Sequence, residues 1–423
     1  MPLVEHLPVG APVEARRSRA TDLRVGLLGL GRVGSAVARL ANETSIRIEA
    51  ALVRDPRSRR RVDDVPLTTR ADAILDSRPD VIVEVLGGLE PARTIVLRAI
   101  NRGIPVVTAN KSLLAHHGDE IIDAADAAGV PLCYEASVIA GVPFLETFAR
   151  RPLAARITSL TGIVNGTTNY ILSRLAAGAG DYRAALCEAQ RLGYAEPDPS
   201  SDVRGVDAAE KLIVLLRQFA ARSIQIADVE TIGITALTSA DCVHAAALGG
   251  TIKPIVHADW SSGALSAFAG PAFVPSTHPL AAVHGSANGI LLRDCRRQTI
   301  GLTGPGAGPE STAITILDDV RQAAEGRTTP ATVRRRGWFE LPETSWLVRL
   351  AGANLTGERE IENAFVSRGV GIVRTSSRPR DDHAQWLLTY PAERPRIEAA
   401  ARALSAAACC SISCIRALAT PEL

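Results

Sequence analysis

The sequence predicts an α/β protein with a doubly wound parallel sheet first, then an α+β domain and a small C-terminal module. Three observations support this prediction. The chain has 423 residues, the length of two or three domains. In its first third, short apolar runs alternate with helix-length patterns, as in a parallel sheet wrapped by helices. Near its end, strand and helix patterns follow in the ferredoxin-like order β-α-β-β-α-β.

The first domain is expected at residues 23–135. The expected strands are Leu23–Leu28, Ile46–Val53, Val81–Leu86, Pro105–Thr108 and Val130–Tyr134. Helical patterns lie between them, for example at 90–102 and 116–128. Residues 1–22 show no periodicity, so we expect them to form a disordered extension.

The middle of the chain, residues 136–325, mixes both kinds of pattern. Helices are expected at 168–178, 181–192 and 207–221, and β-rich segments at 156–164 and 287–304. We interpret this part as a domain for substrate binding and oligomerisation. Its C-terminal part is a candidate to return to the first domain.

A linker is expected at residues 326–340, within the arginine-rich stretch "EGRTTPATVRRRGW". The C-terminal module then covers 341–423. Its expected strands are 344–350, 370–376, 384–390 and 411–417, and its expected helices are 356–367 and 394–407.

Composition excludes several classes of partner. The net charge is only +2, which does not favour nucleic acid or an anionic membrane surface. No apolar run reaches the roughly 18 to 20 residues that a bilayer span needs, and the first residues lack the apolar core of a secretory signal. The seven cysteines show no zinc or redox spacing and are interpreted as reduced thiols. We therefore expect a cytoplasmic protein that acts on a small molecule.

A glycine motif, "GLGRVGS", follows the first expected strand and opens a helix. Its glycines suit a tight turn, the close approach of a pyrophosphate to backbone N–H groups, and tight packing of the helix on the strand. A glycine-rich turn without a ligand is the alternative. The pattern favours a Rossmann-like dinucleotide-binding domain, with a cofactor loop made of Gly29, Leu30, Gly31, Arg32, Val33 and Gly34.

The end of the second strand distinguishes NADP from NAD, because an acidic residue there would hydrogen-bond the ribose and repel a 2′-phosphate. Here Arg54 follows the strand, and more arginines come after it, although Asp55 is adjacent. NADP(H) is therefore preferred and NAD(H) is the alternative cofactor. An exposed charged face is the other interpretation of these arginines.

Two further features lie at expected strand ends. Gly87 and Gly88 precede a helix that Pro91 can start. Lys111 follows the next apolar strand, at the sheet edge where open α/β folds bind ligands. We expect all three residues to contact the cofactor, with an anionic group beside the lysine.

Lysine is rare in this chain. Only Lys111, Lys211 and Lys253 occur, within a Lys+Arg total of 47. An ammonium group can transfer a proton near neutral pH, whereas a guanidinium group cannot. Asp207 precedes Lys211 by four residues, so both lie on one face of a helix. The alternative is a capping pair of Asp207 with Glu210 and an ordinary surface salt bridge at Lys211.

Several separated blocks resemble the homoserine dehydrogenase family over about residues 23–320. They are "GLGRVGS", "GGLEPA", "VVTANKSLLA", "YEASVIAGVP", "GIVNGTTNYIL", "LGYAEPDPSSDVRGVDAAEK", "HPLAAVHG" and "GPGAG". The resemblance implies reduction of L-aspartate 4-semialdehyde to L-homoserine by NADPH or NADH, a step toward threonine and methionine. A relative with a different semialdehyde substrate, and a silent regulatory paralogue that binds NADP, are the alternatives.

The resemblance also assigns roles to residues. Lys211 is the implied proton donor, with Asp202 orienting it and Lys111 on the cofactor and substrate side. Glu196 and Asp207 are implied to bind the substrate ammonium. Gly193 and Gly306 match glycines near the nicotinamide, although loops without ligand contact are the alternative.

A monovalent cation, Na⁺ or K⁺, is implied at a loop between the domains. The matching positions are Glu135, Val138, Ala140 and Val142. The chain departs from the family at Ile139, where glycine is usual, and at Arg32, where smaller or polar residues are commoner.

Lys253 matches a family lysine that we expect on a helix, which Pro254 would interrupt, and no chemistry is assigned to it. The C-terminal module is similar to the amino-acid-sensing ACT domain, but its first turn reads "LAGANLTGERE" in place of the usual Asp-x-Pro-Gly-like turn. A role in dimerisation or edge pairing is the alternative. A homodimer or homotetramer is expected.

Overall fold

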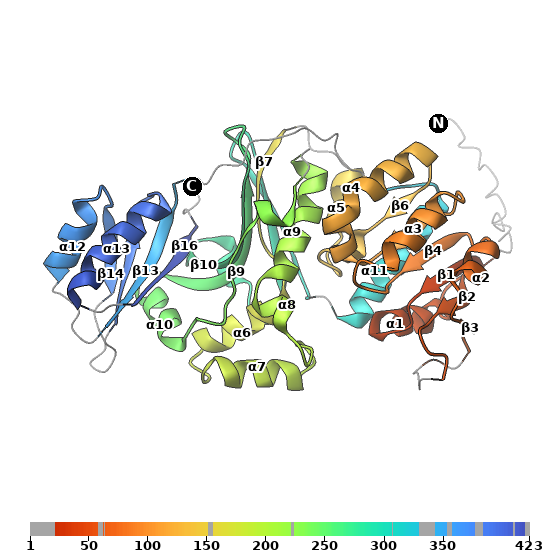
Figure 1. Cartoon of the computed structure of the whole chain (residues 1–423), viewed down its shortest axis with the longest axis horizontal. Helices are drawn as coiled ribbons and strands as arrows, with labels where there is room; N and C mark the ends of the chain where they lie inside the picture. The colour runs from red at the N-terminus through yellow and green to blue at the C-terminus, as the bar shows by residue number, and fades with distance from the viewer. Residues whose placement is uncertain are drawn as a thin grey trace, which may run out of the picture.

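The computed structural model describes residues 22–57, 62, 64–150, 155–220, 224–306, 308–329, 343–352, 358–376, 384–408 and 411–418. Figure 1 shows three parts in a row, with the C-terminal module at one end and the first domain at the other. Almost all of the expected extension and most of the expected linker lie outside the described residues, as do residues 353–357 in the first turn of the C-terminal module.

The first domain is a six-stranded parallel sheet with the order β3-β2-β1-β4-β5-β6. This is the strand order of a doubly wound dinucleotide-binding fold, and the order reverses between β1 and β4. Its strands are β1 (Leu23–Leu28), β2 (Ile46–Leu52), β3 (Leu67–Thr68), β4 (Val81–Glu84), β5 (Val106–Thr108) and β6 (Leu132–Cys133). The five predicted strands are confirmed, and β3 is an addition.

Helices cover both faces of this sheet. They are α1 (Arg32–Ala41), α2 (Ala71–Asp76), α3 (Ala92–Ile100), α4 (Lys111–Ala128) and, from much later in the chain, α11 (Pro309–Ala324). α4 begins five residues before the predicted 116 because Asn110 caps it: the Asn110 side chain accepts a hydrogen bond from the Leu113 N–H at 3.1 Å. α11 packs against α1, where Arg39 pairs with Glu310 at 2.6 Å.

The middle of the chain supplies six strands of a ten-stranded mixed sheet, from its edge strand β12 to β10. Its strands are β7 (Ile157–Ile163), β8 (Glu230–Thr231), β9 (Gly250–Asp259), β10 (Ser266–Pro275), β11 (Asn288–Asp294) and β12 (Thr299–Gly304). Its helices are α5 (Leu145–Arg150), α6 (Gly166–Ala176), α7 (Tyr182–Arg191), α8 (Ser200–Val203), α9 (Val206–Phe219) and α10 (Ser239–Ala247). Helices α6, α9 and α10 all contact β9.

The expectation that Lys253 lies on a helix interrupted by Pro254 is wrong, because both residues belong to β9. Pro254 stands opposite Pro271 of β10 in the antiparallel ladder. Opposed residues of such a ladder alternate between hydrogen-bonded and non-hydrogen-bonded pairs, so two opposed prolines fit a pair that needs no N–H donor. The proline therefore does not break the strand.

The C-terminal module contains the predicted order of elements. They are β13 (Ser345–Ala351), α12 (Glu358–Val366), β14 (Ile372–Ser376), β15 (Ala384–Thr389), α13 (Arg394–Ala408) and β16 (Ser411–Ala417). β16 pairs with β10 in parallel, so this module continues the central sheet. Trp346, Val348 and Leu350 share a core with α12 and α13, whereas Leu347 packs in a cluster that includes α10, as the alternation of strand side chains requires.

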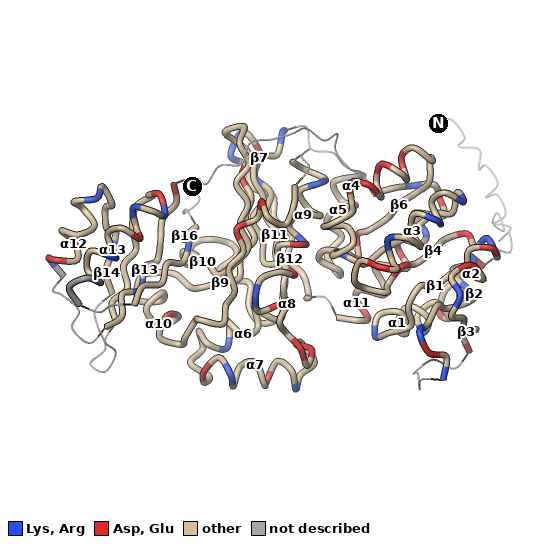
Figure 2. The backbone as a smooth tube through the Cα atoms, in the orientation of Figure 1, with Lys and Arg blue, Asp and Glu red and all other residues tan. Residues whose placement is uncertain are grey.

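Charged groups also attach the module to the central sheet. Glu230 of β8 forms ion pairs with Arg394 at 2.7 Å and with Arg416 at 2.5 Å. The Arg416 guanidinium also lies 5.1 Å from the ring of Phe268 and 5.6 Å from the ring of Trp346. Elsewhere, Lys and Arg alternate with Asp and Glu along the chain (Figure 2), as the low net charge leads one to expect.

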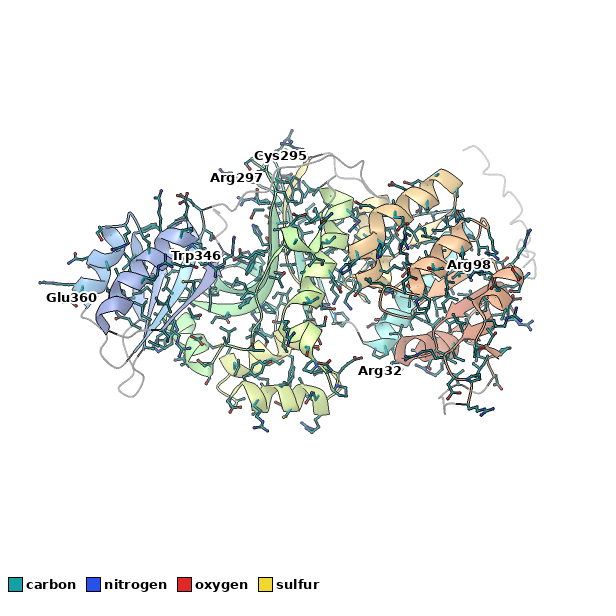
Figure 3. All side chains as sticks on the ribbon, viewed as in Figure 1. Arg32, Arg98, Cys295, Arg297, Trp346 and Glu360 are labelled. Atoms are coloured by element: carbon teal, nitrogen blue, oxygen red, sulfur yellow. The ribbon has the colours of Figure 1, made fainter. Side chains whose placement is uncertain are left out.

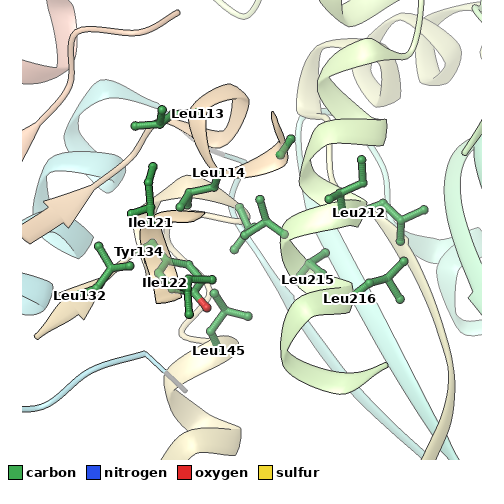
Figure 4. Packing of buried hydrophobic residues seen from close by; sticks show 14 of the residues in the cluster. Leu113, Leu114, Ile121, Ile122, Leu132, Tyr134, Leu145, Leu212, Leu215 and Leu216 are labelled. Atoms are coloured by element: carbon green, nitrogen blue, oxygen red, sulfur yellow. The ribbon is translucent and has the colours of Figure 1, made fainter. Parts of the chain in front are cut away.

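The largest apolar core runs between the first two domains. Figure 4 shows leucine and isoleucine side chains of α4 and α9 close together, and Leu113, Ile121, Leu212 and Leu215 all belong to this cluster of buried residues. Within the described part of the chain, no helix is long and apolar enough to cross a membrane.

We predict that Glu230→Ala lowers the free energy of unfolding by about 3 kcal/mol, because it leaves the Arg416 guanidinium without its carboxylate in a mostly buried position. The side chain of Arg416 is only 9% exposed, whereas that of Arg394 is 44% exposed. Urea unfolding measures the change.

The matched control is Glu398→Ala, which removes the exposed partner of Arg394 on α13. That change should alter stability by about 0.5 kcal/mol or less. Equal losses in the two variants would contradict the proposed attachment at Glu230.

Candidate active site

A cavity of about 320 Å³ lies at the carboxyl ends of the first sheet's strands, where the second domain closes over them. Its lining includes Val33, Gly87, Gly88, Lys111, Lys211 and Thr312. The lining thus brings together residues from the glycine motif, the end of β4, the start of α4, α9 and α11. Ligands bind at this edge of open α/β sheets, beside the point where the strand order reverses.

The glycine motif has the geometry that a pyrophosphate needs. Gly29 has φ +109°, and a Cβ there would lie 2.7 Å from the carbonyl oxygen of Val85. A Cβ at Gly34 would overlap the carbonyl oxygen of Gly29, whereas one at Gly31 would meet nothing within 4 Å. Gly31 is the N-cap of α1 and supplies no side-chain cap. The helix N-terminus is therefore open to an anion, so these residues fit a dinucleotide.

Arg32 belongs to this loop and lies on the side of the first domain that faces the second domain (Figure 3). Its guanidinium lies 3.5 Å from the carboxylate of Glu196, and both side chains are more than half exposed. The structure thus pairs two predicted site residues, one from each domain. Leu30, between the first two glycines, is buried.

Arg54 is exposed, two residues beyond the end of β2. The neighbouring Asp55 accepts a hydrogen bond from the backbone N–H of Arg57 at 2.9 Å. Arg59, Arg60 and Arg61, which support the predicted 2′-phosphate contact, lie outside the described residues.

A buried carboxyl group supports the turn at Gly87 and Gly88, and sequence reasoning missed it. Glu84, the last residue of β4, is fully buried and accepts a hydrogen bond from the Thr108 hydroxyl at 2.6 Å. It also accepts hydrogen bonds from the Leu86 N–H at 2.8 Å and from the side-chain amide of Asn110 at 3.3 Å. Burial raises the pKa of Glu84, while these donors act in the opposite direction.

Asn110 connects that turn to α4. Its side-chain amide donates to the carbonyl of Gly88 at 2.8 Å, and its oxygen caps the helix that begins with Lys111. Gly87 and Gly88 have φ of +73° and +71°, which glycine adopts without strain. The network of Glu84, Thr108 and Asn110 therefore fixes both glycines and Lys111 relative to one another.

Asp207 lies between two ammonium groups from different domains. Its carboxylate oxygens are 3.0 Å from Nζ of Lys111 and 2.9 Å from Nζ of Lys211. Burial acts to raise the pKa of Asp207, but the two ammonium groups outweigh it and hold the pKa well below its usual range. The attraction of Asp207 in turn raises the pKa of Lys111.

Asn165 completes this cluster and was also missed. Its side-chain amide donates to Asp202 and to Asp207, each at 2.7 Å, and its oxygen caps α6 through the N–H of Thr168. Burial and the nearby Asp207 raise the pKa of Asp202. An asparagine in a glycine-rich turn carries no periodic signal, although its place in "VNGTTN", one residue before a helix, is typical of a cap.

The alternative of a capping pair with a surface salt bridge is wrong. The N-cap of α9 is Gly205, without a side-chain hydrogen bond, and Lys211 is buried. Glu210 instead accepts a hydrogen bond from the Ser112 hydroxyl of α4 at 2.7 Å. The polar face of α9 therefore bonds to the first domain.

Backbone conformation or packing within the chain accounts for glycine at the two remaining predicted positions. Gly193 follows α7 with φ +79°, a left-handed conformation that favours glycine. A Cβ at Gly306 would overlap the carbonyl oxygen of Ser286. Contact of either glycine with a nicotinamide stays a prediction.

Backbone donors bind the Glu135 carboxylate, and its role in holding a cation stays a prediction. Its oxygens accept hydrogen bonds from the backbone N–H groups of Phe144, Leu145 and Glu146 at 2.9, 3.1 and 2.6 Å. Burial raises the pKa of this carboxyl group to about 7. The described residues contain no group of three His, Cys, Asp or Glu that could hold a metal ion. An ion bound through backbone oxygens of Val138, Ala140 and Val142 stays a prediction.

The chain matches known protein families in two parts that correspond to the first and second domains. A family model described as "Homoserine dehydrogenase, NAD binding domain" matches residues 29–135, and one described as "Homoserine dehydrogenase" matches residues 143–320. The homoserine dehydrogenase of Mycobacterium tuberculosis is 40% identical over 373 residues, which cover 82% of this chain and 85% of that protein. That of Bacillus subtilis is 37% identical over 314 residues, which cover 70% and 72%.

A solved structure of a homoserine dehydrogenase from Thiobacillus denitrificans is similar over nearly the whole chain. The TM-score is 0.82 at 30% identity, and the match covers 94% of this chain and 98% of the other.

We predict that Asp207→Asn lowers the free energy of unfolding at pH 7 by about 3 to 5 kcal/mol, because two ammonium groups lose their shared carboxylate. The folded-state pKa of Asp207 lies below its unfolded value of about 4, so this contribution is present above about pH 4 and disappears as the pH falls through the folded-state pKa. Urea unfolding from pH 7 to pH 2 should show the stabilities of the variant and the unmodified chain converging steadily below about pH 4.

Asp202→Asn is the control, because the pKa of Asp202 is shifted in the opposite direction to that of Asp207. The pKa of Asp202 is raised, so its ionised form is disfavoured in the folded state at neutral pH. This variant should be as stable as the unmodified chain at pH 7 or more so. A difference for Asp207→Asn that stays constant down to pH 3 would contradict the assignment.

Proposed function

The chain belongs to the homoserine dehydrogenase family, and on this premise we propose that it reduces L-aspartate 4-semialdehyde to L-homoserine with NADPH. One observation supports this most strongly: Lys111 and Lys211, which line the cavity together with Gly87 and Gly88, share the carboxylate of Asp207. A bound reduced nicotinamide supplies the hydride. The residues of the chain then hold the aldehyde and provide the proton.

Lys211 is the proposed proton donor. An ammonium group has three N–H donors. One points to the carbonyl of Val164 at 2.9 Å and one to Asp207 at 2.9 Å, which leaves the third for a substrate oxygen in the cavity that Lys211 lines. Donation to the oxygen that becomes the hydroxyl neutralises the charge developing there. After transfer, Val164 and Asp207 still orient the amine.

The carboxylates have different proposed tasks. Asp207 holds both lysines and contributes the negative charge that attracts the substrate ammonium. Glu196 is exposed and lies opposite Arg32 of the glycine motif. We propose that the substrate ammonium replaces Arg32 as the partner of Glu196, which leaves the guanidinium free to meet a cofactor phosphate. Asp202, through Asn165, keeps Asp207 and hence Lys211 oriented.

NADP preference is part of this proposal. The exposed Arg54, two residues beyond β2, supports this preference because dinucleotide-binding folds bind the ribose near the end of the second strand, and Asp55 is engaged with the backbone of its own loop. NAD remains the alternative cofactor.

The C-terminal module is proposed to be ACT-like on the strength of its element order and its sheet order β16-β13-β15-β14. Its task is then subunit pairing in a dimer or tetramer, or binding of an amino acid effector. A silent paralogue is disfavoured, because the two lysines and Asp207 are in contact with one another.

We predict that Lys211→Met lowers kcat for aspartate semialdehyde by about 10²- to 10⁴-fold, the range for loss of a general acid. Lys211→Arg should lower kcat by a similar factor, because a guanidinium keeps its proton. NADPH oxidation measures turnover, and quenching of protein fluorescence measures cofactor binding, which should be retained. Turnover of Lys211→Met within about threefold of the unmodified chain would exclude this donor.

Arg54→Ala is expected to lower kcat/KM with NADPH by about 10- to 150-fold and to leave the value with NADH unchanged, because a charge-assisted hydrogen bond is worth roughly 1.5 to 3 kcal/mol. Arg57→Ala, three residues along the same exposed segment, is the matched control. An unchanged ratio of the two efficiencies in Arg54→Ala would exclude the 2′-phosphate contact.

A further inference from the structure

Lys253 is the third lysine of the chain and the one that the proposed reaction does not use. It lies on β9 and is only 2% exposed. Its ammonium donates a hydrogen bond to the carbonyl of Val283 at 2.6 Å and lies 3.3 Å from Nδ1 of His284. Among the described residues, no carboxylate forms an ion pair with it. A buried amine without a counter-ion is costly, so its presence calls for a specific contact.

The contact is with the connecting segment 283–287, which joins the short helix Pro279–Ala282 to β11. Helix α6 binds the same segment from another direction. The side-chain amide of Asn169 donates to the carbonyls of Val283 at 3.3 Å and Ala287 at 3.0 Å. The hydroxyl oxygen of Ser173 accepts a hydrogen bond from the N–H of Gly285 at 3.1 Å. Lys253 and α6 therefore fix both ends of the segment.

The middle of the segment packs against two glycines. A Cβ at Gly166 would lie 2.6 Å from the carbonyl oxygen of Ser286, and a Cβ at Gly306 would overlap the same oxygen. This carbonyl thus fills the space that two missing side chains leave. Its position fixes the first residue of α6 on one side and the turn before α11 on the other.

Both glycines are next to the active site. Asn165, directly before Gly166, donates to Asp202 and Asp207, and Asp207 holds the proton donor Lys211. Gly306 leads into α11, whose Thr312 lines the cavity. A chain of contacts therefore connects Lys253 to the carboxylates without Lys253 reaching the cavity itself.

We propose that Lys253 is a positioning residue for the dehydrogenase site, an inference that rests on the proposed function. It holds segment 283–287 so that the Ser286 carbonyl fixes the start of α6 and, with it, the amide of Asn165. Asn165 then sets how Asp207 meets Lys211.

The choice of lysine over arginine fits this role. Burial lowers the pKa of the Lys253 ammonium to about 8, and burial of an unpaired guanidinium would be costlier because that group cannot lose its charge. An amine still donates to the Val283 carbonyl after deprotonation. The groups that face Lys253 are the Cys242 thiol of α10 and the imidazole of His284.

The test compares Lys253→Met with Val256→Ala. Val256 lies three residues further along β9, so its side chain points to the opposite face of the strand, where it is fully buried. We expect Lys253→Met to lower kcat about tenfold, to shift the apparent pKa of the kcat profile, and to leave NADPH binding within about twofold. Val256→Ala should lose stability but keep the pH profile. An unchanged kcat profile in Lys253→Met, or the same change in both variants, would overturn the inference.

Hydrogen exchange supplies a readout that does not require turnover. The N–H of Thr168 is bonded to the Asn165 side chain at 2.8 Å and should exchange faster in Lys253→Met but not in Val256→Ala. Equal protection of this amide in Lys253→Met and the unmodified chain would overturn the inference, whereas absence of turnover in the unmodified chain would contradict only the proposed function.

If Lys253→Met does not fold, Asn169→Ser serves in its place, because it removes the two hydrogen bonds from α6 to the same segment. It should produce the same loss of Thr168 protection and the same shift of the kcat profile. Unchanged values in this variant would equally overturn the inference.

Discussion

The site depends on one buried carboxylate that two domains share. Asp207 comes from α9 of the central domain, and its ammonium partners come from the same helix and from the first residue of α4 in the nucleotide-binding domain. Burying the charges of Asp207 and Lys211 is costly unless each is paired and hydrogen-bonded. The geometry meets this condition, because Asn165 and the Val164 carbonyl supply the remaining partners. The cluster therefore forms only when the two domains are packed together.

The surrounding structure keeps the domains in that arrangement. α4 and α9 contribute apolar side chains to one continuous core, and the hydrogen bond of Ser112 with Glu210 lies beside it. On the cofactor side, Glu84 and Asn110 hold the turn of Gly87 and Gly88 against the start of α4. Stability and chemistry thus rest on the same two helices. Asp207 and Lys211 are buried, so solvent screens their interaction less than it would at the surface.

Much of this could be predicted from the sequence, because the informative residues carry strong local patterns. The glycine motif, the apolar strands and the i, i+4 spacing of Asp207 with Lys211 each have a geometric meaning of their own. No such local pattern marks Glu84, Thr108 and Asn165, because their roles depend on partners 24 to 42 residues away in the sequence. The strand at Lys253 was hidden for the same reason, since long-range packing outweighs local propensity there, whereas a return of the C-terminal part of the middle segment to the first domain was among the expectations. The pairing of Arg32 with Glu196 spans 164 positions.

The most direct test of the account is a double-mutant cycle on kcat with Asp207→Asn and Lys211→Met. If Asp207 affects kcat by orienting the protonated Lys211, the double variant should be no slower than Lys211→Met alone, because no proton donor is left to orient; the contacts of Asp207 with Lys111 and the substrate ammonium should then affect KM. Losses that multiply in the double variant would show that the two side chains act independently, and would contradict the central claim.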